Sequence, residues 1–352
     1  MNKLIDAIDQ VIEENNLPHE WSKEISTELK QLKHKKESKK RVDLRSYPFV
    51  TIDGKDAKDF DDAVFCKEES NGFMLQVAIA DVADIVKQGT ELDFEALKRG
   101  TSIYFPKKVI PMLPEEISNN LCSLVPKEDR NVLVCKIIFN KEGVINSYEF
   151  NEAIINSNKR FTYNEVEFLL QDKEINISSK ILQSIIALKK LTKKLLKERL
   201  KRNALEIDSS EPVLKFNNKD GISEISVPKR LFAHQMIEEA MISANICAAK
   251  FIKKHLGFGV YRVHEEPESL KIENLKKFFS LKGLSSKSFL DTLELINGFI
   301  GHINKNEENK MLNILILQSL KRAQYSTKEV GHFGLQLKEY SHFTSPIRRY
   351  PD

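Results

Sequence analysis

The sequence lacks the features that mark several protein classes. Its four cysteines form no Cys-x-x-Cys pair, and each lies in an apolar stretch, where a small buried thiol is the simplest interpretation. No segment approaches the ~20 apolar residues of a membrane-spanning helix, and the amino terminus has no apolar run of signal-peptide length. We therefore expect a reduced, cytoplasmic protein with no membrane partner.

An excess of one sign of charge is also missing. Lys and Arg number 55 against 51 Asp and Glu, so net charge gives only weak support for a nucleic-acid partner. Basic residues are concentrated locally instead, with six in residues 33–41 and nine from Lys180 to Arg202. Each tract fits either a solvated surface or a contact with nucleic-acid phosphates, and the sequence leaves both open.

The spacing of apolar residues predicts helices first and then strands. From Leu4 to Leu32 the spacing is helical and predicts two short helices. Extended apolar runs begin at Tyr47, with a hairpin signal at Asn71-Gly72 and a second tight connection at residues 141–143. The first half is therefore expected to form a sheet rich in antiparallel strands.

The second half is expected to be mostly helical. Residues 178–202 carry apolar side chains on one face and basic ones on the other, which predicts a long amphipathic helix. Strands should return at 212–227, and helices should dominate 230–256 and 269–325. The fold class that follows is mixed α/β, with the sheet packed by helices.

One stretch concentrates acidic side chains. Residues 52–63, IDGKDAKDFDDA, hold five carboxylates within ten residues: Asp53, Asp56, Asp59, Asp61 and Asp62. Two ionised carboxylates about 4 Å apart repel by up to ~4 kcal/mol at an effective dielectric near 20, and a divalent cation would relieve this repulsion. A polar turn with side-chain caps explains many such loops equally well. The spacing of an EF-hand calcium loop is absent.

Magnesium suits such a loop because it prefers oxygen ligands and keeps several waters. Four carboxylates can serve two ions, which together can activate a water and stabilise a leaving oxygen in phosphodiester hydrolysis. The histidines that could suggest another metal site lack zinc-type spacing, and we interpret them as structural: His264, His332 and His342.

Around this loop the sequence resembles the ribonuclease II and ribonuclease R family of exoribonucleases, and most of all its ribonuclease R branch. The resemblance begins with VDLRSYPFVTIDGKDAKDFDDAV (42–64) and VAIADVADIV (77–86). It continues, in the order typical of the family, with RGTSIYFPKKVIPMLPEEISNNLCSLVP (99–126), IEEAMISANICAAKF (237–251) and GHFGLQLKEYSHFTSPIRRYPD (331–352). The chain is thus similar to the family's catalytic domain, the RNB domain, from about residue 40 onward.

The resemblance implies an activity and a set of site residues. The activity is magnesium-dependent hydrolysis of single-stranded RNA from its 3′ end, releasing nucleoside 5′-monophosphates, with no organic cofactor and with the chain acting as a monomer. The family's magnesium-binding aspartates, for two ions, match Asp53, Asp59, Asp61 and Asp62. Asp56 falls outside that pattern and is interpreted as a turn residue.

Further roles follow from the same resemblance. Arg348 would contact the scissile phosphate, and its neighbour Arg349 would have a structural or phosphate-contacting role. Tyr104 would stack on a base near the 3′ end, although by residue type alone such a tyrosine is more often a core residue. Glu238, which is adjacent to Glu239, would lie near the terminal ribose, where contact with the 2′-hydroxyl favours RNA over DNA.

The chain also departs from the family pattern. Family members carry OB-fold RNA-binding domains on both sides of the catalytic domain, and neither is expected here. We expect a helical segment and basic linker at 1–41, followed by an RNB catalytic domain at 42–352 that is incomplete at its carboxyl end. Because OB folds grip single strands, their absence should weaken binding and processivity.

Two other functions stay open on the sequence. The chain could be a non-catalytic RNA-binding remnant whose truncated fold does not organise two metals. It could also be a hydrolase of small phosphate esters, a reading supported only by the aspartate-rich loop. Magnesium-dependent release of mononucleotides from RNA would distinguish an exoribonuclease from both alternatives.

Overall fold

The computed structural model describes residues 3–32, 40–171, 176–207, 213–217, 221–281, 291–304 and 311–352. The chain divides into two compact units, each described by itself below. The first comprises residues 1–192, 212–244 and 343–352, and the second comprises 193–211 and 245–342. Most of the basic tract at 33–41 lies outside the described residues, so the linker predicted there stays a prediction.

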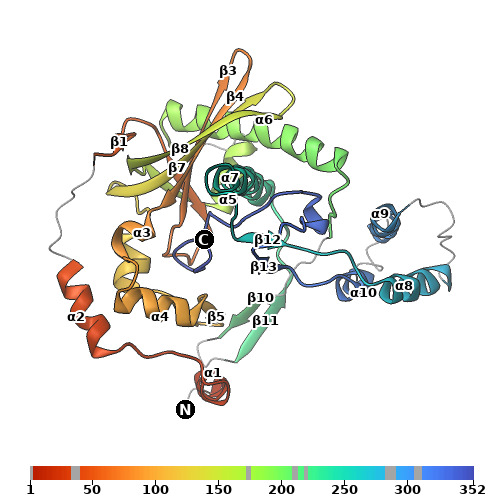
Figure 1. The fold of residues 1–352 in the computed structure, drawn as a ribbon, viewed down its shortest axis with the longest axis horizontal. Helices are drawn as coiled ribbons and strands as arrows, with labels where there is room; N and C mark the ends of the chain where they lie inside the picture. The colour runs from red at the N-terminus through yellow and green to blue at the C-terminus, as the bar shows by residue number, and fades with distance from the viewer. Residues whose placement is uncertain are drawn as a thin grey trace. The chain divides into compact units, whose positions relative to one another are not determined.

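The first unit is built around a seven-stranded sheet with the order β1-β8-β7-β4-β3-β2-β9 (Figure 1). Neighbouring strands are antiparallel except in the β1–β8 and β2–β9 pairs. The strands are β1 (Val42–Asp43), β2 (Val50–Asp53), β3 (Asp62–Glu69), β4 (Gly72–Ala80), β7 (Asp129–Asn140), β8 (Ile145–Asn156) and β9 (Lys159–Thr162). The predicted mixed α/β class and antiparallel-rich sheet are confirmed.

The β3–β4 hairpin turns at Asn71-Gly72, as the sequence predicts. Gly72 has a φ of 149° and lies so close to β7 that a Cβ there would stand 1.9 Å from the Phe139 carbonyl oxygen. Glycine is therefore required by packing across the sheet as well as by the turn.

Helices cover both faces of this sheet. Every residue of β4 is buried, which explains why FMLQVAIA is almost continuously apolar instead of alternating. On one face, Ile25 and Leu92 join the sheet core, and they come from the helices α2 (Lys23–Leu32) and α4 (Glu91–Arg99). On the other face lies α6 (Ser179–Lys201), where the Ser184 hydroxyl accepts a hydrogen bond from the Cys66 N–H at 3.0 Å.

Smaller elements complete the first unit. They are α1 (Lys3–Glu14), α3 (Val82–Ile85), the hairpins β5–β6 (Ile103–Phe105, Lys108–Ile110) and β10–β11 (Val213–Phe216, Ile222–Ser226), a π-helical turn (Ile117–Leu121) and α5 (Tyr163–Leu170). The two short amino-terminal helices, the long amphipathic helix and the strands near 212–227 are thereby confirmed. All four cysteines are buried with free thiols, as expected.

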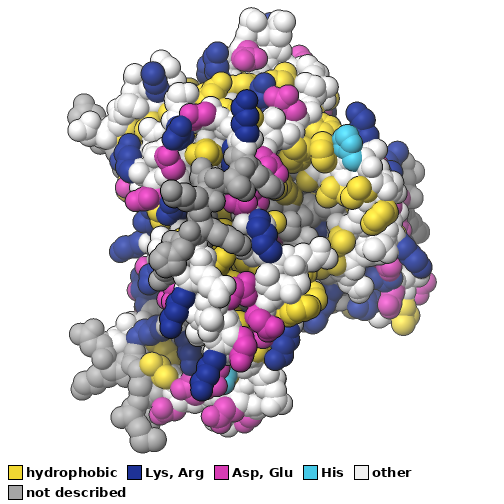
Figure 2. Space-filling view, turned by 60° about the vertical axis from the view of Figure 1, so that its left-hand side comes forward, with side chains coloured by type: hydrophobic (Ala, Val, Ile, Leu, Met, Phe, Trp, Pro, Cys, Tyr) yellow, Lys and Arg dark blue, Asp and Glu magenta, His cyan; other side chains and the backbone are white. Residues whose placement is uncertain are grey.

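The surface carries charges of both signs. On the face in Figure 2, Lys and Arg side chains are interspersed with Asp and Glu, as the near-balanced composition suggests. Across the described ranges, no helix is both long and apolar enough to cross a membrane.

The second unit is mainly helical. The boundary between the units falls within α6 and within α7 (Phe232–Leu256). Three helices, α8 (Ser269–Leu281), α9 (Thr292–Ile303) and α10 (Asn313–Ser319), share an apolar core, in which Phe279 and Phe299 stack with ring centroids 4.0 Å apart. A short antiparallel pair, β12 (Tyr261–Val263) and β13 (Gln324–Ser326), and a 3₁₀ turn at Phe333–Leu335 complete the unit.

Two histidines organise the segment around the 3₁₀ turn. The Nδ1 atom of His332 accepts a hydrogen bond from the Leu335 N–H at 3.1 Å, and Nδ1 of His264 accepts one from the Gly334 N–H at 3.1 Å. Because both Nδ1 atoms accept hydrogen bonds, they carry no proton, and both imidazole rings are neutral in this arrangement. Burial and the adjacent His264 lower the pKa of His332 to about 4. The structural interpretation of these two histidines is supported by this arrangement.

The lowered pKa of His332 predicts stability that depends on pH. In the unfolded chain the group titrates near 6.5, so between pH 6.5 and about 4 the unfolded state binds more protons. The contribution of neutral His332 to the free energy of unfolding is therefore complete above pH 6.5. It is lost as pH falls, by on the order of 1–3 kcal/mol. Thermal unfolding at pH 7.5 and pH 4.5 should show this loss.

A matched variant isolates the imidazole. In His332→Asn, an amide oxygen can still accept from the Leu335 N–H but does not titrate. This variant should show a smaller drop in melting temperature between the two pH values than the unmodified chain. An equal drop in both proteins would remove His332 as the cause.

Candidate active site

The aspartate loop joins two neighbouring antiparallel strands at one end of the sheet. Asp53 is the last residue of β2 and Asp62 is the first residue of β3, while Asp59 and Asp61 lie on the connection. Because β2 and β3 pair with each other, the end of one strand and the start of the next lie close together. Chain topology therefore brings the carboxylates into one region.

Neighbouring segments hold this loop in place. The Arg160 guanidinium donates to the carbonyl oxygens of Gly54 and Lys55. The Phe60 N–H donates to the Ser123 hydroxyl oxygen at 3.0 Å, and that hydroxyl donates back to the loop backbone at 2.7 Å. Phe60 itself is buried. The loop is thus fixed at several points, although the carboxylates on it repel one another.

The expected site residues from three separate motifs meet at one cavity of about 790 Å³. Its lining includes the four predicted metal-binding aspartates together with the predicted tyrosine and arginine: Asp53, Asp59, Asp61, Asp62, Tyr104 and Arg348. Asp56 also lines the cavity. The structure therefore brings together residues that are up to almost 300 positions apart in the sequence.

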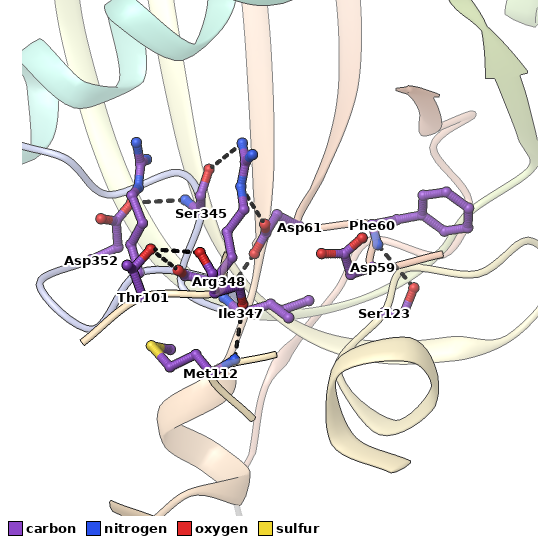
Figure 3. A network of polar contacts seen from close by, with 12 residues as sticks. Asp59, Phe60, Asp61, Thr101, Met112, Ser123, Ser345, Ile347, Arg348 and Asp352 are labelled. Carbon is purple, nitrogen blue, oxygen red and sulfur yellow. Dashed lines mark hydrogen bonds and ion pairs between the residues drawn. The ribbon is translucent and has the colours of Figure 1, made fainter. Parts of the chain in front are cut away.

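Asp61 connects the loop to the segment that carries the arginine (Figure 3). Its Oδ1 accepts a hydrogen bond from the Ile347 N–H at 2.8 Å, and its Oδ2 lies 3.6 Å from Nε of Arg348. The Arg348 carbonyl oxygen accepts from the Thr101 hydroxyl at 2.9 Å and from the Ser102 N–H at 3.0 Å. The backbone on both sides of the arginine is therefore fixed, and the half-exposed guanidinium reaches the cavity.

Burial and mutual repulsion raise the pKa values of the carboxylates. Burial raises the pKa of Asp61 to about 8, opposed by the Ile347 N–H and Arg348. Burial, with a further contribution from Asp59, raises the pKa of Asp53 to about 6. The pKa of Asp62 is also raised, first by burial and then by the charges of Asp53 and Asp61. A positive charge in the cavity would lower all three pKa values.

The oxygen donors fit a hard divalent cation. One carboxylate oxygen of Asp53, Oδ2, is buried without a hydrogen-bond partner, so it is available as a ligand. Within the described residues, no three His, Cys, Asp or Glu side chains are arranged so that together they could hold an ion. Magnesium commonly takes one or two protein carboxylates and completes its shell with water and phosphate. The donors suit such partial coordination better than a closed protein cage.

Tyr104 lies at the surface of the cavity. Its side chain is 54% exposed, and its hydroxyl donates to Oδ2 of Asp59 at 3.2 Å. The alternative reading of Tyr104 as a core residue is therefore wrong. An exposed ring beside the carboxylates is available for stacking.

Two predicted RNA-binding residues are not in the lining of this cavity. The Glu238 carboxylate forms an ion pair with the Arg230 guanidinium, and Arg349 forms one with Asp352 at 2.7 Å. The adjacent Glu239 is buried. Contacts of Glu238 with ribose and of Arg349 with phosphate stay predictions.

The cavity also contains residues that the sequence did not reveal. Tyr163 lines it because β9 runs parallel to β2, with Thr162 opposite Asp53, and Tyr163 follows directly. Lys107 and Lys108 line it from the β5–β6 hairpin. No local pattern marks Tyr163, because its position depends on the pairing of strands more than 100 residues apart.

Comparison with known proteins gives this arrangement a context. Residues 41–352 match the RNB domain family. The chain belongs to that family. This RNB chain is 42% identical to ribonuclease R of Vibrio parahaemolyticus over 97% of its own length and 42% of the relative's, and 40% identical to ribonuclease R of Escherichia coli over 98% and 43%. It therefore spans less than half the length of these relatives.

A solved structure is similar to this RNB chain as well. It is RNase R from Mycoplasma genitalium in complex with ribose-methylated single-stranded RNA, with 31% sequence identity and a TM-score of 0.92. The similarity covers 98% of this chain and 55% of that one. The fold expected from the family resemblance is thus confirmed.

The crowded carboxylates predict that removing one charge stabilises the metal-free protein. Asp62→Asn removes an ionisation that burial, Asp53 and Asp61 all oppose. A raised folded-state pKa means that stability is lost as pH rises from the unfolded value of 3.8 through the folded one. With chelator at pH 7.5, the variant should therefore unfold at a higher temperature than the unmodified chain.

The matched control is Asp56→Asn, on the same loop but exposed. It should leave the melting temperature within error of the unmodified chain. If Asp62→Asn melts at the same or a lower temperature in chelator, repulsion does not limit the stability of this loop.

Proposed function

We propose that this chain is the catalytic part of a magnesium-dependent exoribonuclease that hydrolyses single-stranded RNA from the 3′ end and releases nucleoside 5′-monophosphates. The observation that carries the proposal is the convergence of Asp53, Asp59, Asp61, Asp62 and Arg348 on one cavity. The curated relatives named ribonuclease R support the same reaction, and so does the solved relative bound to single-stranded RNA. Residues 42–352 form the catalytic domain in this proposal.

The four aspartates would hold magnesium, two ions in all, together with RNA phosphate and water. When bound, magnesium supplies an activated water and neutralises charge on the phosphate in a phosphodiester hydrolysis. In the protein, the raised pKa values of Asp53 and Asp61 show how strongly the cavity opposes uncompensated negative charge. The same carboxylates therefore gain most from a cation.

Arg348 would bind the scissile phosphate. Its backbone is held by the Thr101 hydroxyl and the Ser102 N–H, so the guanidinium is positioned before RNA enters. A planar guanidinium can donate two parallel hydrogen bonds to a phosphate, which stabilises charge that develops during the reaction. Because Asp61 pairs with this side chain, the arginine and the carboxylates would be organised together.

Tyr104 would stack on a base at the 3′ end, since every base offers a π-face and stacking tolerates any sequence. The proposal is supported by the exposure of the ring and by the hydroxyl, which donates to Asp59 beside the other carboxylates. Glu238 would contact the terminal ribose and Arg349 a phosphate after their present ion pairs rearrange.

A second candidate function is RNA binding without catalysis. The observation that favours it is the lack, among the described residues, of three side chains arranged to hold a metal. In that case the cavity would bind a 3′ end through Tyr104 and Arg348 but would not cleave it.

The deciding experiment uses uniformly labelled single-stranded RNA, the purified chain, and either magnesium or chelator. We expect mononucleotides only with magnesium. Asp62→Asn should still bind RNA but should not cleave it, because the substitution removes a ligand charge and keeps the side-chain shape. Binding without products in both proteins would support the second candidate, and products in chelator would contradict the metal assignment.

A second prediction concerns the guanidinium of Arg348. Arg348→Lys keeps the charge and loses the paired donors, so kcat should fall on the order of 100-fold with little change in RNA affinity. The control is Arg45→Lys, an exposed arginine that pairs with Asp43 and Asp129, whose substitution should leave kcat unchanged. A kcat for Arg348→Lys within threefold of the unmodified chain would exclude the phosphate-binding role.

A further inference from the structure

The amino-terminal helix α1 packs against the hairpin that carries Tyr104. This helix precedes the region that matches the RNB family, which begins at residue 41. Ile8 and Ile12 of α1 form a buried apolar cluster with Ile110 of β6, and all three side chains are at most 5% exposed. Other apolar side chains packed against this cluster are Leu4, Leu17, Ile103 and Phe105. The contact is therefore a small core rather than a loose surface contact.

A polar contact joins the same two elements. The Asp9 carboxylate of α1 lies 2.6 Å from Nζ of Lys108 on β6. Both side chains are more than one third exposed, so the pair adds little stability. The pair joins α1 to the strand that also carries Ile110, so a polar contact and the apolar cluster connect the same two elements.

The segment after α1 is fixed to the first unit at two further points. The Arg99 guanidinium donates to the Glu20 carbonyl oxygen at 2.7 Å and lies 3.7 Å from the centre of the Trp21 ring. The Glu28 carboxylate of α2 accepts from the Leu92 N–H at 3.1 Å. These contacts hold Glu20, Trp21 and α2 against α4, the helix that leads directly into the β5–β6 hairpin.

The hairpin depends on outside support. Its strands have three residues each and, among the strands that the structure describes, pair with one another alone. An isolated two-stranded hairpin is marginally stable at best. Side chains alternate between the faces of a strand. Ile103 and Phe105 therefore pack against the α1 cluster, while Tyr104 between them turns to the other face, where its hydroxyl reaches Asp59. Phe105 also contributes to the lining of the cavity.

We propose that α1 is a positioning element for the RNA-binding cavity, and that Ile8 and Ile12 are positioning residues that hold Tyr104 beside Asp59 through the hairpin. This inference rests on the proposed function, because it assigns α1 the task of orienting the ring on which a 3′-terminal base stacks. Without the apolar cluster the hairpin would sample several orientations. RNA affinity would then fall, while the carboxylates and Arg348, which are held by other contacts, would keep their geometry.

The test is a double-mutant cycle. The double variant Ile8→Ala/Ile12→Ala removes the apolar contact between α1 and the hairpin, and we call it the brace variant. In chelator its dissociation constant for single-stranded RNA should be about tenfold higher than that of the unmodified chain. This rise is within the range expected for loss of one base–aromatic stack. With magnesium and saturating RNA, kcat should change less than twofold, so the effect appears in KM. In a Tyr104→Ala background the brace variant should have no further effect on affinity.

The matched control is Val11→Ala, which removes an apolar side chain from the exposed side of the same helix (41% exposed). It should leave affinity, KM and kcat unchanged. If the double variant does not fold, Ile12→Ala alone is used in the same cycle. An affinity loss of equal size with and without Tyr104 would overturn the proposal, because α1 would then act only through general stability.

A measurement without RNA separates this inference from the proposed function. Amide hydrogen exchange of residues 103–110 should become faster in the brace variant, while exchange in β4 and β7 should not change. If exchange becomes faster but the chain neither binds nor cleaves RNA, the proposed function is refuted and the positioning of the hairpin by α1 is still supported. If exchange is unchanged and the chain cleaves RNA, the positioning role of α1 is refuted and the proposed function is still supported.

Discussion

The crowding of partly and fully buried carboxylates is the constraint on which the arrangement of the cavity depends. Burial and neighbouring charges raise the pKa values of Asp53, Asp61 and Asp62. The carboxylates would therefore separate if their loop were free to move. Arg160 and Ser123 hold its backbone, and Asp61 is held by contacts from the segment around Arg348. Such a site is organised at the expense of stability, which is typical of binding and catalytic sites.

Hydrogen bonds also connect the segments that carry the site residues. Asp61 accepts from the backbone beside Arg348, and the Arg348 carbonyl oxygen accepts from Thr101 and Ser102. The Ser102 hydroxyl also accepts from the Met112 N–H at 2.9 Å, which closes the base of the β5–β6 hairpin. The aspartate loop, the arginine segment and the base of the tyrosine hairpin are therefore linked by hydrogen bonds, while the orientation of the hairpin itself depends on its apolar contacts with α1.

Function in this RNB chain therefore depends on support from outside the cavity. Tyr104 and Arg348 lie on short segments. Contacts with helices, strands and the amino-terminal segment hold these segments in place. A displacement of about 1 Å in a catalytic group can reduce the rate by a factor on the order of 100, so these supporting contacts matter as much as the groups that would touch RNA.

The sequence by itself determined much of the secondary structure and the identity of the acidic cluster. Helical apolar spacing predicted α1, α2 and α6, because that pattern reports which face of a helix is buried. Extended apolar runs on either side of Asn71-Gly72 predicted the β3–β4 hairpin. Only the tertiary structure decided that Tyr163 joins the cavity, that Tyr104 is exposed, and that Glu238 pairs with Arg230. These features depend on strand pairing and on contacts between residues distant in sequence, and local patterns carry no record of them.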